Sequence, residues 1–383
     1  MKVLILGSDG YIGYPLTLHL LKQGYRVMGI DNYTRRQRVF SVGGSSLTPI
    51  LGPQMRKAYL TNQFPNYAGC VSMNLNEFDR LQAILNTFQP DAIVHLAEQP
   101  SAAWSMKSMT HALVTQEENV LNTLTLLWLI KETCPHTHLI KLGSMGEYGT
   151  PECDIPEGMI PGECLHEYKK SLYCPMKGLP FPRSPGSFYH LSKVHDTYNI
   201  IFACNNWGLT STDIMQGVVF GLGNFDNDSE LTRFDYDEYF GTVINRFCVQ
   251  AICNHPLTIY GTGDQQRGFL PLQDSIQCIT IAIENPPNQG EYRTLNQFAN
   301  VYKIGELAEM VQNAVPFIPL NCIPNPRTEA LEHYYNPTHE KLFQLGYEPT
   351  TDIQGEITKL VNQLKPYAAK VKQAVLYPTT HWK

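Results

Sequence analysis

The sequence predicts an α/β fold built on a doubly wound parallel sheet, with a smaller C-terminal lobe interleaved with it. A glycine triplet, Gly7-Ser-Asp-Gly10-Tyr-Ile-Gly13, joins the apolar run Val3–Leu6 to an amphipathic segment. An acidic residue, Asp31, ends a second apolar run about 20 residues later. Segments typical of strands and of helices then alternate through residues 1–150, as they do in parallel sheets whose crossovers are helices.

The first unit of this pattern predicts a dinucleotide site. An uninterrupted apolar strand enters the glycine turn, and a helix follows over 14–23 before the next strand at 25–30. The glycines permit a tight turn against a pyrophosphate, which the positive end of the helix then faces. A carboxylate at Asp31 accepts hydrogen bonds from a ribose diol and favours NAD. Arg35 and Arg36 follow closely, beside adenine or phosphate, and keep NADP as an alternative.

The alternation continues beyond this unit. Residues 41–68 are rich in Gly, Ser, Pro and Asn, and we expect an irregular excursion with one short helix there. Strands are predicted at 70–74, 92–96, 139–144 and 212–220, and helices at 76–88, 115–133, 188–206, 239–253 and 274–284. The proline-rich stretch 150–186 predicts a loop over the site, and the acidic stretch 222–237 predicts a mobile segment.

Small or polar residues follow several of these strands directly. Gly7, Asp31, Ala97 and Ser144 all come at the carboxyl end of a predicted strand. Ligands of doubly wound sheets collect at that edge, so we expect these residues to meet there. The predicted architecture is therefore of the Rossmann type, with NAD as its cofactor.

A tyrosine and a lysine stand four residues apart in the helix predicted at 188–206. At that spacing Tyr189 and Lys193 project from one face of the helix. A tyrosine is a poor base at its free pKa of about 10, and an adjacent ammonium favours the phenolate. With Ser144 bridging phenol and substrate, the pair predicts a relay that deprotonates a hydroxyl while a hydride leaves the same carbon. Taken alone, the pair also fits an ordinary amphipathic helix, and the nucleotide site favours catalysis.

Composition limits the classes of function. The chain has 383 residues, of which 43% are hydrophobic and 17% charged, as in globular proteins. A net charge of −6 without a basic stripe argues against nucleic acid, and no apolar run reaches the roughly 20 residues of a membrane span. The ten cysteines form no Cys-x-x-Cys pair, which predicts reduced structural thiols and no metal site. A strand beginning at Lys2 leaves no room for a leader, so we expect a cytoplasmic protein.

Further motifs carry a resemblance to a known family. Besides the glycine triplet with Asp31 and the Tyr189/Lys193 pair, they are Gln265-x-Arg267, Met145-Gly-Glu-Tyr-Gly-Thr-Pro151, Ser187-Phe-Tyr-His-Leu-Ser-Lys-Val-His-Asp196 and Glu332-His-Tyr-Tyr-Asn336. On these residues the chain resembles the extended short-chain dehydrogenase/reductases that act on nucleotide sugars, and among them the UDP-sulfoquinovose synthases. The motifs span nearly the whole chain in order.

This resemblance implies a reaction on UDP-glucose with tightly held NAD. The sugar is oxidised at C4, water is lost across C5 and C6, sulfite adds at C6, and C4 is reduced again. A UDP-sugar 4-epimerase or a dehydratase of the same family that does not use sulfite is the alternative. It stays open because the family has arginine where Pro100 stands. By analogy, the helices at 115–133 and 188–206 would form the face of a homodimer.

The resemblance also implies a division into two units. Residues 1–180 would form the NAD-binding domain, continued by about 186–221 and 256–298. Residues of about 222–255 and 299–383 would form the nucleotide-sugar-binding lobe.

The resemblance finally assigns site residues. The catalytic set is Tyr189, Lys193, Ser144, His190, Met145 and Glu147. Within it Tyr189 is the C4 base, Lys193 its partner, and His190 the group that moves the C5 proton or assists the departure of water. The expected cofactor contacts are Gly7, Asp9, Gly10, Tyr11, Ile12, Gly13, Asp31, Asn32, Arg35, Arg36, Asn74, Leu75, Leu96, Ala97, Glu98, Asn119, Leu142, Tyr189, Lys193, Gln216 and Val219. The expected substrate contacts are Gln99, Arg246, Arg267, Arg327, Glu329, Gln216 and Thr242.

Overall fold

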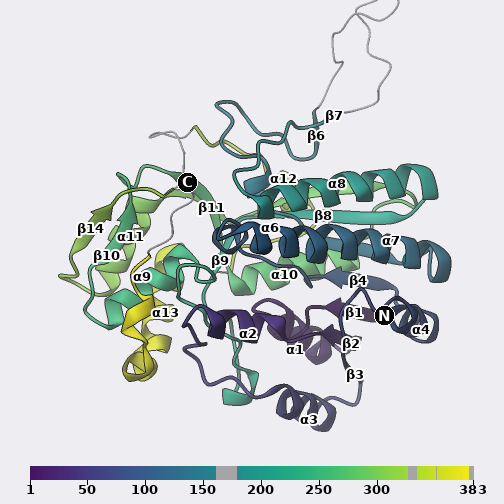
Figure 1. The fold of residues 1–383 in the computed structure, drawn as a ribbon, viewed down its shortest axis with the longest axis horizontal. Helices are drawn as coiled ribbons and strands as arrows, with labels where there is room; N and C mark the ends of the chain where they lie inside the picture. The colour runs from purple at the N-terminus through teal and green to yellow at the C-terminus, as the bar shows by residue number, and fades with distance from the viewer. Residues whose placement is uncertain (161–178, 327–333, 351, 379–383) are drawn as a thin grey trace, which may run out of the picture.

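A seven-stranded parallel sheet forms the centre of the computed structural model, which describes residues 1–160, 179–326, 334–350 and 352–378 (Figure 1). Its strands are β1 (Lys2–Leu6), β2 (Arg26–Asp31), β3 (Tyr67–Ser72), β4 (Ala92–His95), β5 (His138–Leu142), β8 (Thr210–Gln216) and β12 (Tyr292–Gln297). Their order is β12-β8-β5-β4-β1-β2-β3, so the direction of winding reverses between β1 and β4. This confirms the predicted fold class and places a topological switch point beside β1.

Helices cover both faces of the sheet, because its strands are apolar on both sides. Val3 and Ile5 of β1 belong to one buried cluster, whereas Leu4 and Leu6 belong to another on the opposite face. The first cluster includes α1 (Gly13–Lys22) and α10 (Leu272–Glu284), and the second includes α4 (Phe78–Phe88), α7 (Asn122–Thr133) and α8 (Phe188–Trp207). Figure 1 shows α7 and α8 running side by side along the sheet.

The strand predicted at 212–220 is two strands in different sheets. β8 ends in the large sheet, and β9 (Val218–Phe220) pairs with β11 (Gln266–Pro271), which in turn pairs with β13 (Asn300–Lys303). Gly217 lies at the crossing, where a Cβ atom would stand 2.7 Å from the carbonyl oxygen of Gly268. The prediction of one strand was wrong because this glycine lets the chain change sheets.

A second core lies in the lobe beside the large sheet, at the left of Figure 1. It is built from the parallel pair β10 (Leu257–Tyr260) and β14 (Leu320–Ile323) with α9 (Val243–Ile252), α11 (Ile304–Ala314) and α13 (Ile353–Leu364). β10 lies in the stretch that we assigned to the larger unit, yet its side chains pack in this lobe. The domain boundaries themselves stay a prediction.

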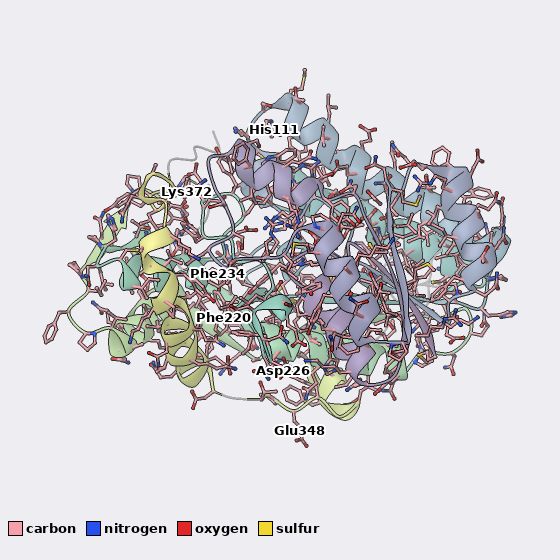
Figure 2. All side chains as sticks on the ribbon, turned by 90° about the horizontal axis from the view of Figure 1, so that it is seen from below. His111, Phe220, Asp226, Phe234, Glu348 and Lys372 are labelled. Carbon is pink, nitrogen blue, oxygen red and sulfur yellow. The ribbon has the colours of Figure 1, made fainter. Side chains whose placement is uncertain are left out.

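The second half of the segment predicted to be mobile, 230–237, is buried, with Phe234 and Tyr236 in this second core, whereas 224–229 are exposed or half-buried. Phe234 and Tyr236 are at most 1% exposed, and Figure 2 labels Phe234 beside the buried Phe220. The neighbouring Arg233 and Asp235 are hydrogen-bonded to each other, with Nε of the arginine 2.9 Å from the carboxylate. The prediction was wrong for 230–237, where apolar and paired charged residues alternate, so a polar composition coexists with burial.

Several other boundaries also differ from the expected ones. The stretch 41–68 is more regular than expected, with α2 (Thr34–Ser41) ending in it, α3 (Pro53–Gln63) inside it and β3 beginning at Tyr67. The helix predicted at 115–133 begins earlier as α6 (Met109–Gln116) and continues into α7 through a π-helical turn, η1 (Glu117–Leu121). The helix predicted at 239–253 begins only at Val243.

The remaining elements are short. They are α5 (Ala102–Ser105), β6 (Met159–Ile160), β7 (Leu179–Pro180), α12 (Glu340–Gln344) and the 3-10 turns at 145–147, 228–230, 365–370 and 373–375. Among the described residues, every helix is too short or too polar to cross a lipid bilayer.

Candidate active site

One cavity of about 1010 Å³ opens at the carboxyl ends of the strands, at the predicted edge of the sheet. The predicted site residues that line it are Gly7, Gly10, Tyr11, Ile12, Gly13, Asp31, Asn32, Arg35, Asn74, Leu75, Leu96, Ala97, Glu98, Leu142, Ser144, Met145, Tyr189, His190, Lys193, Gln216, Val219, Thr242 and Arg267. The wall does not include Asp9, Arg36, Gln99, Asn119, Glu147 or Arg246. Arg327 and Glu329 fall outside the described residues.

The glycine turn forms one end of the cavity and is shaped for close approach of a ligand. Gly7 has a φ of 86°, in the left-handed region that glycine tolerates. A Cβ atom on Gly13 would stand 2.1 Å from the carbonyl oxygen of Gly7, so the turn closes only with glycine there. Because α1 begins at Gly13, the positive end of its dipole faces this end of the cavity.

Asp31 closes the same end at the last position of β2. Its carboxylate accepts hydrogen bonds from the backbone N–H groups of Asp9, at 2.8 Å, and Tyr33, at 2.7 Å. Burial nevertheless raises the pKa of Asp31 to about 6, and these two hydrogen bonds oppose that shift. A carboxylate that lines a cavity at this position fits the ribose of NAD.

The two arginines after Asp31 already have carboxylate partners. Arg36 binds Asp9 through two nitrogens, at 2.6 and 2.8 Å, and Arg35 binds Asp235 in the same manner, at 3.1 and 2.9 Å. We expected both arginines beside adenine or phosphate, and Asp9 as a cofactor contact. In the structure Asp9 binds arginines instead. Its carboxylate also accepts a hydrogen bond of 2.8 Å from Arg56, which ties the glycine turn to α3.

The middle of the cavity holds the tyrosine and lysine of α8. The ammonium of Lys193 forms a buried ion pair with Glu98 and donates a hydrogen bond of 2.6 Å to the carbonyl oxygen of Leu142. It lies 5.7 Å from the centre of the Tyr189 ring. Burial and Glu98 raise the pKa of Tyr189, while Lys141 and a hydrogen bond with Ser144 lower it. The phenol therefore needs further positive charge from its ligands before it acts as a base.

The turn after β5 presents Ser144 to the cavity. The hydroxyl of Ser144 accepts a hydrogen bond of 3.1 Å from the backbone N–H of Gly146, and the carboxyl of Glu147 accepts one of 3.0 Å from the N–H of Ser144. Glu147 is fully buried beneath this turn, whereas Met145 lines the cavity. Burial and then Asp213 raise the pKa of Glu147, which favours its neutral form.

His190 lies beside the tyrosine, with the two rings 5.0 Å apart. Its Nδ1 atom is 3.0 Å from the hydroxyl of Ser187, the residue that caps the N-terminus of α8. Its Nε2 atom faces the turn, since a Cβ atom on Gly146 would stand 2.2 Å from it. The imidazole is therefore held at one ring nitrogen and pressed against the turn that carries Ser144.

The expected substrate contacts divide into two sets. Thr242, Arg267 and Gln216 line the cavity on the side of the lobe. Arg246 is buried beneath them, 5.7 Å from the centre of the Tyr260 ring.

Gln99 and Asn119, expected to contact substrate and cofactor, instead bind each other. The side-chain oxygen of Asn119 accepts a hydrogen bond of 2.7 Å from the backbone N–H of Gln99. The side-chain N–H group of Asn119 donates one of 2.8 Å to Ser192. Both residues are fully buried, so they brace the loop after β4 against α8.

Sequence reasoning missed an arginine on the cavity wall. Arg38 lines the cavity, forms an ion pair with Glu118 and lies 4.7 Å above the ring of Trp104. The π-helical turn η1 turns Glu118 toward the cavity, and no spacing in the sequence signals such a turn. Arg38 itself looks like any polar residue of a surface helix.

Comparison with known proteins places the chain in a family. A model of the NAD dependent epimerase/dehydratase family matches residues 3–297. The chloroplastic UDP-sulfoquinovose synthase of Spinacia oleracea is 41% identical, over 100% of this chain and 79% of that protein. The UDP-sulfoquinovose synthase of Sulfolobus acidocaldarius is 42% identical, over 100% of this chain and 98% of that protein.

Solved structures agree on the fold. A variant of UDP-glucuronic acid 4-epimerase from Bacillus cereus, solved with UDP-4-deoxy-4-fluoro-glucuronic acid and NAD, superposes with a TM-score of 0.71 at 20% identity. That alignment covers 96% of this chain and 99% of the epimerase. The chain belongs to the NAD dependent epimerase/dehydratase family.

Proposed function

We propose that the protein is an NAD-dependent enzyme that converts UDP-glucose and sulfite into UDP-sulfoquinovose. The observation that carries the proposal is identity of 41% and 42% to two UDP-sulfoquinovose synthases over the whole of this chain. The cavity supports it, since Tyr189, Lys193, Ser144 and His190 all lie on its wall.

The described residues fit NAD at the end of the cavity formed by the glycine turn. The glycines leave room for a pyrophosphate against the start of α1, and Asp31 accepts hydrogen bonds from a ribose. When bound, NAD supplies the hydride acceptor for C4 and gives the same hydride back at the end of the cycle. A carboxylate at Asp31 favours a ribose diol over a 2′-phosphate, and so NAD over NADP.

The chemistry at C4 belongs to Tyr189. Its phenolate oxygen removes the proton of the C4 hydroxyl, and Ser144 shares a hydrogen bond with that hydroxyl. Lys193 adds positive charge beside the phenol and holds its own position through Leu142 and Glu98. Oxidation at C4 gives a ketone, which makes the proton on C5 acidic.

The chemistry at C5 and C6 needs a second acid/base group, and we assign this role to His190, which lies on the cavity wall beside Tyr189. The imidazole removes the C5 proton and helps the C6 hydroxyl to leave as water, which gives an unsaturated ketone. Sulfite then adds at C6, and a proton returns to C5. Met145 lines this part of the cavity, and the buried Glu147 holds the backbone of the Ser144 turn.

The uridine diphosphate would be held on the side of the lobe. Arg267 and Thr242 stand on that wall, and a guanidinium group suits bidentate contact with a phosphate. Arg246 is buried one helical turn after Thr242, and burial lowers its pKa, so a nearby anion would favour its charged form. Arg327 and Glu329 complete the proposed set on the strength of the resemblance.

A UDP-sugar 4-epimerase or dehydratase that does not use sulfite is the second candidate. Pro100 favours it, because this residue lies on the cavity wall and offers no positive charge to an anionic nucleophile. A simple epimerase would not need His190.

We also propose a homodimer through α6, η1, α7 and α8. Large apolar side chains are exposed along these neighbouring helices, namely Met109, Leu113, Leu121, Trp128 and Phe202. Such a contiguous face is typical of a protein–protein contact. Sedimentation equilibrium of the wild type and of a Leu121→Glu/Trp128→Glu variant tests this proposal, which a monomeric wild type would contradict.

Mass spectrometry of the products tests the proposed function. The NAD-loaded protein is incubated with UDP-glucose, with and without sulfite, beside a Tyr189→Phe variant as the inactive control. We expect a sulfonated nucleotide sugar only with sulfite and only with the wild type. Loss of water without capture of sulfite would favour a dehydratase, and an unchanged mass with a changed sugar would favour an epimerase.

A further inference from the structure

A cluster of ionisable side chains lies buried behind the wall that carries Tyr189. Its members are Glu98 after β4, Lys141 on β5, Glu147 in the turn after β5, Lys193 and Asp196 on α8, and Asp213 on β8. Each of these side chains is 4% exposed or less. The mechanism proposed above uses Lys193, Glu98 and Glu147, whereas it assigns no step to Lys141, Asp196 or Asp213.

The two ammonium groups of this cluster differ in their partners. Lys193 makes close contacts to the Glu98 carboxylate and to a backbone carbonyl, so most of its charge is offset where it stands. Lys141 has no such close partner among the described residues. Its Nζ atom lies 3.5 Å from Oδ2 of Asp196 and 3.5 Å from the carbonyl oxygen of Lys193. It is therefore held against α8 one turn below the catalytic pair.

The carboxyl oxygens indicate that protons are shared within the cluster. Both side-chain oxygens of Asp196 and Oε1 of Glu98 have no hydrogen-bond donor among the described groups. Oδ1 of Asp213 also has no hydrogen-bond donor among the described groups, whereas Oδ2 accepts a hydrogen bond of 2.6 Å from the hydroxyl of Thr197. A proton on the Asp196 carboxyl would give Glu98 the hydrogen-bond donor that it lacks. Burial favours this proton, because it raises the pKa of Asp196 well above its ordinary value.

Burial raises the pKa of Glu147 as well as that of Asp196, so two of the acidic side chains around Lys141 favour their neutral forms. Glu98 pairs closely with Lys193, whereas Lys141 makes no hydrogen bond or ion pair shorter than 3.5 Å among the described residues. His95 of β4 also faces Lys141, and burial lowers its pKa to about 4, so it is neutral near pH 7.

We propose that Lys141 is a positioning residue that acts on Tyr189 through its charge, as the buried cation that favours the phenolate during C4 oxidation. This inference rests on the proposed function, and it gives to Lys141 part of the work usually assigned to Lys193 alone. In agreement with it, Lys141 lowers the pKa of Tyr189 against the opposing effects of burial and Glu98. A lysine that served only for packing would be replaced at less cost by an apolar side chain, since burying an ammonium is unfavourable.

The proposal predicts how the activity of a Lys141→Met variant depends on pH. Tyr189 must be ionised to act, so we expect removal of Lys141 to raise the pH at which activity appears by on the order of one unit. On the acidic side of the pH profile this shift lowers the rate about tenfold at a given pH. Activity recovers at higher pH, and a Lys141→Arg variant keeps the wild-type profile. Lys341→Met is the matched control, because the ammonium of Lys341 binds the backbone of Glu157 and lies away from the cavity.

Two measurements keep the inference separate from the proposed function. The first is the pH profile of C4 oxidation with UDP-glucose. The second is an ultraviolet titration of tyrosine ionisation in the NAD-loaded protein without turnover. The absorbance of the same protein carrying Tyr189→Phe is subtracted, so that the difference reports Tyr189 alone. We expect the midpoint of that difference to rise in Lys141→Met and to stay unchanged in Lys341→Met. Lys141→Gln replaces Lys141→Met if the methionine variant does not fold.

An unchanged midpoint in a folded Lys141→Met or Lys141→Gln variant overturns the inference, even when activity falls equally at every pH. If the wild type fails to oxidise UDP-glucose while the midpoint still shifts in the variant, the proposed function is wrong and the effect of Lys141 on Tyr189 stands.

Discussion

The hydroxyl of Ser187 lies 3.0 Å from Nδ1 of His190 and also accepts a hydrogen bond of 3.2 Å from the backbone N–H of the same residue. One side chain therefore both caps α8 and sets the orientation of the imidazole. The other ring nitrogen is left to face the turn that carries Ser144. The C5 chemistry that we assign to His190 depends on this arrangement.

Replacement of Ser187 by alanine should weaken both functions of the hydroxyl. We expect a loss of about 1 kcal/mol in the free energy of unfolding from the missing cap. Exchange of the C5 proton of UDP-glucose with solvent deuterium should slow by about tenfold or more, toward the rate of a His190→Ala variant. Ser187→Thr keeps the hydroxyl and is the control. Wild-type exchange in Ser187→Ala would show that His190 does not need this contact.

Replacement of Gly146 by alanine should displace His190 directly, because the added Cβ atom would stand 2.2 Å from Nε2. We expect the exchange of the C5 proton to be lost while NAD still binds, since the glycine turn is untouched. Gly52→Ala, whose added atom meets nothing within 4 Å, is the matched control. Nuclear magnetic resonance of the sugar in deuterated buffer measures the exchange, and equal rates in both variants would refute the placement of His190.

Tyr189 and Lys193 should differ in their effect on stability. Tyr189→Phe keeps the ring in place, so we expect loss of C4 oxidation with nearly unchanged unfolding. Lys193→Met leaves the Glu98 side chain, which is 3% exposed, without its ion-pair partner, and should cost about 3–5 kcal/mol as well as activity. Chemical denaturation compares the two variants. A Lys193→Met variant as stable as the wild type would mean that Glu98 binds a proton instead.

Binding of NAD should weaken below about pH 6, which is the pKa of Asp31 in the folded protein. The ribose donates hydrogen bonds to the ionised carboxylate, so at lower pH NAD must displace a proton. Its affinity should then fall about tenfold per pH unit. The stability of the protein without NAD should change with pH in the opposite direction. The pKa is raised above 3.8, so the stabilising contribution of Asp31 is lost as pH rises through about 6. Calorimetry with Asp31→Asn should show weaker affinity that no longer changes with pH in this range.

The architecture could be predicted from local patterns. The run Val3–Leu6, the glycine turn and Asp31 are adjacent in sequence and make their structure with one another, so spacing alone locates them. The pair Tyr189 and Lys193 is local in the same sense, since four residues on a helix define one face. The three glycines of the turn, Asp31, Tyr189 and Lys193 all line the cavity.

The remaining parts depend on partners far away in sequence. Arg36 looked free for a phosphate until folding brought it to Asp9, and Arg35 meets Asp235 two hundred residues later. The stretch 222–237 looked mobile because charge suggests exposure, whereas Arg233 and Asp235 pair with each other in its buried second half. A pattern of residue types predicts which groups need partners but not which distant residue supplies them.

The fate of the C4 hydrogen tests the central claim most directly. UDP-glucose labelled with deuterium at C4 is incubated with the NAD-loaded protein and sulfite in ordinary water, and the product is analysed by mass spectrometry and nuclear magnetic resonance. We predict a sulfonated nucleotide sugar that keeps the deuterium at C4, because the hydride taken from C4 returns to the same carbon. A sulfonated product without the label, or no sulfonated product at all, would contradict the account.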